Sequence, residues 1–274
     1  HQHRITNGNL RKLIMEYLDK FPILLFFIVM VVAVMAASEI GFHIGIRLQN
    51  RGSNPGESRM TSSVVGGMLG LVAFLMAFSI GITIGHHSER KNMVVTEANA
   101  IGVAWLRAGF LDEADARSLR QLLREYTQIR IAASNQEVEL PAVLERSEEI
   151  HGEMWIIIER NVRQGNDSDI MTSLAEAVND VIKTHSIRLT AAYKRLPIIL
   201  GMVLIVSTIL SFLLVGVASS ADRKRDTPAI FLFAIVFTAV MMIMVDLDRP
   251  QQGMLRVSQT AMADVLRQIE PYSQ

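Results

Sequence analysis

Four long apolar runs dominate the hydrophobic pattern of this chain. A helix needs about 20 residues to cross a hydrocarbon core about 30 Å thick. The four runs cover residues 22–48, 63–85, 197–218 and 228–245. We therefore expect four membrane-spanning helices in two hairpins, each closed by a short link rich in turn-forming residues. A cleaved signal peptide is a rival interpretation of the first run, but that run continues past the candidate cleavage site and three further runs follow.

The stretch between the two hairpins is polar, and its apolar residues recur at helical spacing. One helix is indicated by a stripe of five side chains: Leu119, Leu122, Leu123, Tyr126 and Ile129. Pro141 suits the first turn of a second helix, which we expect to bury Trp155, Ile158 and Val162. No window alternates as a strand would. The pattern predicts an all-α membrane protein, with four transmembrane helices and a helical cytoplasmic domain inserted between spans two and three.

These elements divide the chain into four parts. Residues 1–88 hold an N-terminal segment and the first hairpin, 89–196 the helical domain, 197–246 the second hairpin, and 247–274 a cytoplasmic tail. An even number of spans puts both termini and the helical domain on one side of the membrane. Eleven basic residues lie near the span ends on that side and six on the other. The excess predicts that this side is cytoplasmic.

Composition excludes several classes of function. Lys plus Arg and Asp plus Glu each total 27, so no net positive charge favours nucleic acid as a partner. The chain has no cysteine, which excludes disulfides, thiolate metal sites and a cysteine nucleophile. His86 and His87 are adjacent on a helix and point about 100° apart, a poor geometry for a metal. No nucleophile elbow, phosphate loop or dinucleotide fingerprint occurs, so we expect no enzyme, no cofactor and no metal.

Glu39 is a carboxylate inside the first span, and a carboxylate in hydrocarbon is costly. His43 lies four residues further on the same helix face, and Arg47 four beyond that. One interpretation is a polar stripe along a conduction or proton path. The other is a structural ion pair near the outer membrane interface. The residues alone leave both open.

Glycines mark faces where helices approach closely. Gly41 and Gly45 form a G-x-x-x-G pair in the first span, and the second span repeats a small-residue face at Gly66, Gly67, Gly70, Gly81 and Gly85. Close helix packing is the expected use of both faces. A small-residue face turned towards a pore is the alternative.

The stretch "MVDLDRPQQG" ends the fourth span on Asp246, Asp248 and Arg249. We expect these charges to pair with Arg90, Glu97 or Arg188 on neighbouring helices, forming an interfacial polar lock, after which Pro250 breaks the helix. Glu97 and Asn99 sit among small and apolar neighbours, which predicts that both are buried. The full set of lock residues is Arg90, Glu97, Asn99, Arg107, Arg188, Asp246, Asp248 and Arg249. A pore vestibule lined by the same charges is the alternative.

These stretches resemble the bestrophin-like family of bacterial membrane proteins, a domain family of unknown function. The resemblance extends from Glu39 to about Ser258. It rests on E-A-N-A-I-G followed by Leu106 and Arg107, on Asn179 and Arg188 ahead of Pro197, and on D-x-D-R-P-x-x-G.

More distantly, the chain resembles the bestrophin anion channels, which are pentamers with four spans, cytosolic termini and a cytosolic helical domain. By position, the neck of the pore would correspond to 69–78, with Leu71, Phe74, Leu75 and Phe78 as gate candidates. The second span lacks the arginine–asparagine pair of bacterial bestrophins. No acidic run follows the last span, so the resemblance does not extend to calcium gating.

The resemblance implies a homo-oligomeric channel, pentameric by analogy, in the lipid of the bacterial inner membrane, with the second span lining the pore. The alternative is a membrane-anchored sensor or adaptor whose helical domain binds a cytoplasmic protein. A transporter or enzyme is a third hypothesis, but the two hairpins are too dissimilar for an inverted repeat. Phe74 and Phe78 should face a symmetry axis in a channel and lie buried between helices in an anchor.

Overall fold

The computed structural model describes residues 22–50, 55–135, 138–166, 168–220, 227–249 and 254–270, with side chains from residue 63 onward in the second span. Within these ranges the regular structure is helical and no strand occurs. The helices are α2 (Ile23–Gln49), α3 (Pro55–Arg107), α4 (Glu113–Ser134), α5 (Leu140–Arg163), α6 (Asp169–Tyr193), α7 (Ile198–Ser219), α8 (Thr227–Asp248) and α9 (Thr260–Ile269), with a 3₁₀ turn at Ala108–Phe110.

Four helices are long and apolar enough to cross a membrane: α2, α3, α7 and α8. Their apolar parts coincide with the four predicted spans, so the predicted fold class, an all-α membrane protein with four transmembrane helices, is confirmed. The helix that carries the second span does not end with that span at residue 85. It continues without a break to Arg107, because the residues that follow keep a helical repeat of apolar positions and contain neither proline nor a capping sequence.

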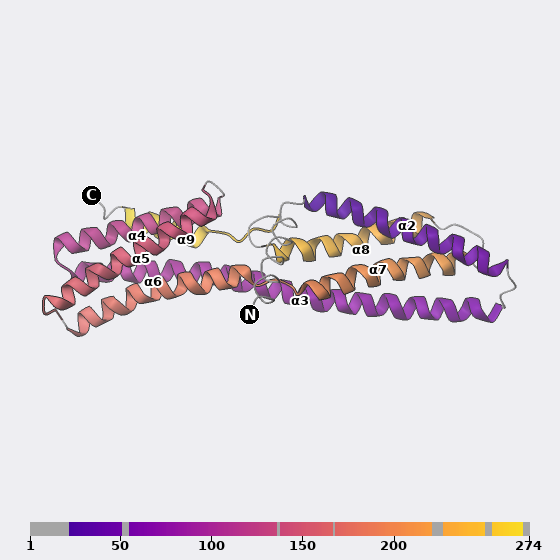
Figure 1. The fold of residues 1–274 in the computed structure, drawn as a ribbon, viewed down its shortest axis with the longest axis horizontal. Coiled ribbons are helices and arrows are strands. Elements are labelled where there is room, and N and C mark those ends of the chain that lie inside the picture. The colour runs from indigo at the N-terminus through magenta and orange to yellow at the C-terminus, as the bar shows by residue number, and fades with distance from the viewer. Residues whose placement is uncertain are drawn as a thin grey trace, which may run out of the picture. The chain divides into compact units, whose positions relative to one another are not determined.

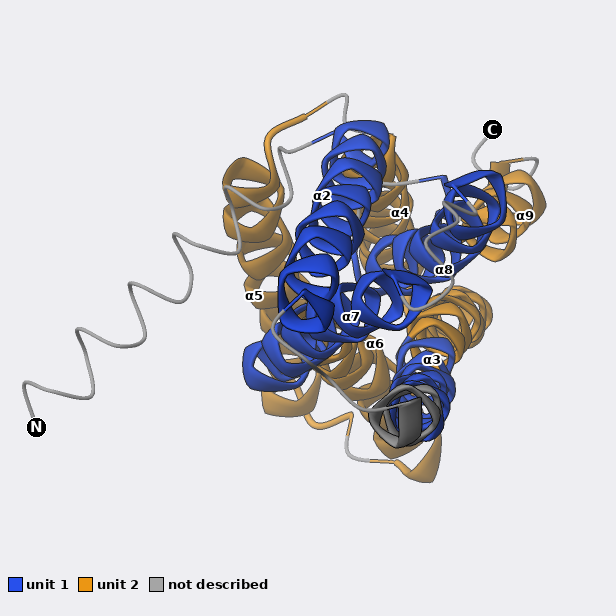
Figure 2. Ribbon diagram, turned by 90° about the vertical axis from the view of Figure 1, so that its right-hand side faces the viewer, with its two compact units in different colours: residues 1–86, 195–256 blue, residues 87–194, 257–274 orange. Residues whose placement is uncertain are grey.

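The chain forms two compact units, coloured separately in Figure 2. The first unit comprises residues 1–86 and 195–256, and so contains the apolar parts of all four spans. Helix α2 packs along α7 and α8 (Figure 1). The core of this first unit is made of large apolar side chains that include Val34, Val72, Phe212 and Met241.

Glycines bring α2 and α7 into backbone contact. A Cβ added at Gly41 would lie 1.9 Å from the Leu213 carbonyl oxygen, and one at Gly216 would lie 1.9 Å from the Ser38 carbonyl oxygen. Close packing at Gly41 and Gly45 is therefore confirmed. The glycines of α3 differ, because a Cβ would meet nothing within 4 Å at any of the following: Gly66, Gly67, Gly70, Gly81 and Gly85.

The second unit comprises residues 87–194 and 257–274, and so contains the end of α3 together with α4, α5, α6 and α9. Asp112 and Ser168 cap α4 and α6 by accepting backbone N–H groups of those helices. Helix α9 lies in the segment that the sequence assigned to a separate tail. Met262 of α9 is fully buried in the same core as Leu123 and Ile150.

One predicted buried face is partly wrong. Ile158 of α5 is buried, but Trp155 and Val162 are exposed. The buried face of α5 instead follows Ile150, Met154, Ile157, Ile158 and Asn161. This set also repeats at three and four residues, so the spacing alone could not distinguish the two faces.

Candidate functional site

Three of the four gate candidates lie on an exposed face of α3 in the first unit. The exposed fractions are 58% for Leu71, 67% for Phe74 and 58% for Phe78. Val72 and Met76 lie on the other side of the same helix and are buried in the core of the unit. The packing within the chain thus fixes the rotation of α3 and leaves the two phenylalanines directed away from the other spans.

The fourth gate candidate, Leu75, is half-buried and packs against the core. The exposed face is extended at both ends by glycine, at Gly67 on one side and at Gly81 and Gly85 on the other. Successive positions 67, 71, 74, 78, 81 and 85 are three or four residues apart, so they form one stripe along the helix. Large side chains therefore occupy its middle and glycines its ends.

The first unit also has a polar feature on its surface, the pair formed by Glu39 and His43 on α2. Oε1 of Glu39 lies 3.4 Å from Nε2 of His43. The side chains of Glu39 and His43 are 49% and 59% exposed, and Arg47 is also exposed. The side chains of Glu39, His43 and Arg47 therefore lie on one outward-facing surface of the span, and Glu39 and His43 contact each other within it.

The carboxylates at the end of α8 accept hydrogen bonds from backbone N–H groups of the first unit. The carboxylate of Asp248 accepts the Leu196 backbone N–H at 2.7 Å. Asp246 accepts the backbone N–H groups of Met254 at 3.0 Å and of Leu255 at 2.9 Å. Arg249 is buried. The two carboxylates of "DLDR" thus hold the chain segments before and after the second hairpin against the end of α8. Pro250 and Gly253 lie outside the described residues.

In the second unit the central feature is Glu97, which is completely buried. Arg188 donates to Oε2 of Glu97, and Nε of Arg130 lies 3.4 Å from Oε1. The hydroxyl of Tyr126 donates to Oε1 at 2.5 Å. Arg188 also donates to Oε1 of Gln259 at 2.9 Å, which ties the segment before α9 to the same group. The cluster joins α3, α4, α6 and the C-terminal segment.

Two histidines extend this cluster. Because the Tyr126 hydroxyl donates to Glu97, it accepts from Nδ1–H of His185, at 2.9 Å. The ring of His151 lies edge-on to that of His185, with centroids 4.9 Å apart. Nε2 of His151 is buried and has no hydrogen-bond partner among the described residues. The arrangement suits two neutral imidazoles beside one carboxylate with two arginines.

Burial and charge act differently on these groups. Burial alone would raise the pKa of Glu97. The charges of Arg188 and Arg130 and the hydrogen bonds from Tyr126 and Arg188 lower it by more, so the net pKa is below its usual value and the carboxylate stays ionised. Burial, followed by the Glu97 charge, raises the pKa of Tyr126 well above its usual value. Burial lowers the pKa of His151 and His185 to about 4.

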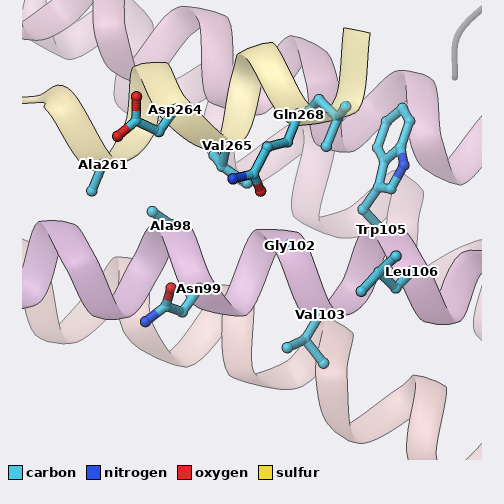
Figure 3. A pocket seen from close by; sticks show the side chains of 11 residues that line it. Ala98, Asn99, Gly102, Val103, Trp105, Leu106, Ala261, Asp264, Val265 and Gln268 are labelled. Atoms are coloured by element: carbon cyan, nitrogen blue, oxygen red, sulfur yellow. The ribbon is translucent and has the colours of Figure 1, made fainter. Parts of the chain in front are cut away.

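The remaining lock residues, Arg90, Asn99 and Arg107, all lie in the second unit. Arg90 is buried and donates to the Lys194 carbonyl at 3.4 Å, and Arg107 donates to the Ser173 carbonyl at 2.5 Å. Asn99 is exposed, so the prediction that it is buried is wrong. Its side chain borders an open groove of about 800 Å³ between α3 and α9, shown in Figure 3. Pairing between the charges at the end of α8 and those of the helical domain stays a prediction.

Sequence reasoning missed Arg130, Tyr126, His151 and His185 as members of the cluster. A signal for Arg130 was present, because it lies four residues after Tyr126 on the stripe that α4 turns to the core. A charge on an apolar stripe needs a buried partner. The two histidines carry a similar signal, because His185 lies four residues after Val181 on the buried face of α6 and His151 lies three residues before Met154 on that of α5. Among the described residues, no group of three or more His, Asp or Glu side chains could hold a metal ion.

The helices, the four spans and the second helical unit together define a multi-pass membrane protein, and the comparisons with known proteins identify its family. The family model of the bestrophin-like domain matches residues 32–262. The chain therefore belongs to the bestrophin-like family. No curated protein matches the chain.

Solved structures of a bacterial bestrophin homologue from Klebsiella pneumoniae share the fold. One mutant of that protein superposes with a TM-score of 0.70 at 14% identity, covering 90% of this chain and 98% of that one. Another mutant gives 0.69 at 17%, covering 92% and 98%. A third structure, phased on zinc, gives 0.67 at 15%, covering 90% and 98%. At these identities the likeness establishes the fold.

Proposed function

We propose that the chain is one subunit of a homo-oligomeric ion channel in which the apolar part of α3 surrounds a central pore. Membership of the bestrophin-like family supports this function, as does the distant resemblance to pentameric anion channels. By the same resemblance, the assembly is a pentamer in the bacterial inner membrane. The excess of basic residues supports a cytoplasmic location for the termini and the helical domain.

The observation that carries the proposal is the exposed stripe of α3. From Gly67 to Gly85 it covers 19 residues, and the 18 steps between them span about 27 Å of helix, close to the thickness of a hydrocarbon core. Several copies arranged around an axis would form an hourglass-shaped passage. Leu71, Phe74 and Phe78 would make an apolar constriction, and the glycines would widen both ends. Such a constriction conducts or closes according to whether water wets it.

The exposure of the two phenylalanines also bears on the alternative function. In a protein whose spans only anchor a cytoplasmic domain, Phe74 and Phe78 were expected to lie between helices. Within the chain both are more than half exposed, in contrast to Val72 and Met76 on the same helix. Neither phenylalanine is therefore buried between helices of one chain, as the channel requires.

Ion flux from liposomes tests the proposal. Purified protein should release an entrapped ion, and Phe74→Ala or Phe78→Ala should increase the release severalfold because each shortened side chain widens the constriction. Ile199→Ala is the matched control, since Ile199 is 72% exposed on α7. Flux that is absent from the unsubstituted protein, or equal in all four proteins, would contradict the proposal. Electron imaging of the purified protein should show a ring with an axial opening.

A further inference from the structure

Glu39 sits on a helix that cannot rotate. Ser38 and Gly41 are on the side of α2 that touches the α7 backbone, where no space remains for even a Cβ. Any rotation of α2 that turned Glu39 towards the bundle would replace glycine at this contact with a larger side chain. The carboxylate is therefore held on the outside of the first unit, where about half of its side chain is exposed.

The same contact gives the depth of Glu39 in the membrane. The Ser38 carbonyl lies level with Gly216, and α7 ends three residues later at Ser219. At 1.5 Å per residue, Glu39 is about 5 Å inside the end of the apolar segment of α7. At that depth a carboxylate facing acyl chains is unfavourable, and the short glutamate side chain has little reach towards water.

The outward face of α2 changes its chemistry along its length. Leu25, Val32 and Glu39 are seven residues apart, so they point in nearly the same direction. Leu25 and Val32 are exposed and apolar, which suits contact with lipid. From Glu39 onward the face carries a carboxylate, an imidazole and, at Arg47, a guanidinium. One half of the face therefore fits lipid and the other half does not.

We propose that the Glu39–His43 surface of α2 is a contact surface for a second copy of this chain. The inference rests on the proposed ring, in which each copy has two different flanks against its neighbours and one face against lipid. The lipid face must be apolar, and Glu39 excludes this part of α2 from it. A flank covered by the neighbouring copy removes the carboxylate and its imidazole partner from the acyl chains.

Photocross-linking distinguishes lipid from protein at this surface. Because the chain has no cysteine, Ile40→Cys provides a single attachment point for a benzophenone maleimide beside Glu39. Leu25→Cys is the matched control on the apolar half of the same helix. Irradiation in lipid vesicles should give a covalent dimer from position 40 and lipid adducts from position 25. In addition, Glu39→Leu should reduce the oligomeric fraction, whereas a lipid-facing position would tolerate leucine.

The mass of the purified protein separates the two proposals. If the protein is an oligomer but position 40 yields lipid adducts alone, or no adduct, the contact surface is wrong and the channel proposal stands. A full oligomeric fraction in Glu39→Leu would also overturn the contact surface. If the protein is a monomer in detergent and in vesicles, both proposals fail together.

Discussion

The buried charge cluster of the second unit makes a quantitative prediction about Glu97→Gln. The substitution preserves shape and removes one negative charge from between Arg188 and Arg130. At 3.4 Å and an effective dielectric constant of about 20, one such pair interacts by about 5 kcal/mol. Breaking a buried pair while leaving its partner typically costs about 3–5 kcal/mol. We expect Glu97→Gln to destabilise the second unit by an amount in this range.

The chain offers a selective probe for this measurement. It contains two tryptophans, Trp105 and Trp155, and both lie in the second unit. Tryptophan fluorescence during urea unfolding in detergent therefore reports on the helical unit and not on the spans. The midpoint should fall markedly in Glu97→Gln.

Glu159→Gln is the matched control for this experiment. Oε2 of Glu159 lies 3.1 Å from Nη2 of Arg163, but both side chains are about half or more exposed. An exposed pair of this kind contributes less than about 1 kcal/mol. If Glu97→Gln and Glu159→Gln shift the midpoint equally, the cluster does not stabilise the unit and the reasoning from burial is wrong.

Two further predictions concern the pH dependence of stability and the packing of α2 against α7. Since His151 and His185 have folded pKa values of about 4, below the unfolded value of 6.5, the unfolded state binds more protons between these pH values. Stability of the second unit should be flat above pH 6.5 and fall below it by up to about 1.4 kcal/mol per pH unit for each histidine; an unchanged urea midpoint at pH 5 would contradict this. In the first unit, Gly41→Ala should cost about 1–3 kcal/mol through overpacking against Leu213, whereas Gly201→Ala, with open space around it, should be neutral; thermal unfolding in detergent compares them.

The spans were predictable from the sequence because twenty consecutive apolar residues have few other structural uses. The close contact at Gly41 was equally accessible, since G-x-x-x-G places two gaps on one helix face. The continuation of α3 to Arg107 was predictable only in part. The sequence showed a helix after the second span, but not that the two are one element.

The inside of the helical unit was harder to predict, for two physical reasons. On α5, Trp155 and Val162 repeat with the same spacing as the face that is buried, and packing against the other helices chose between them. On α3, Glu97 and Asn99 have similar neighbours in the sequence, yet they point about 160° apart around the helix. One meets two arginines in the core and the other faces outward. Local composition cannot decide such a rotation.

The position of α9 sets an order of events during synthesis. Its residue Met262 completes a core whose other members, such as Leu123 and Ile150, precede the second hairpin in the chain. The ribosome must therefore translate α7 and α8 before the helical unit can close its core. Until then the apolar surface that α9 covers stays open, so the unit completes its core only after the last two spans have been synthesised.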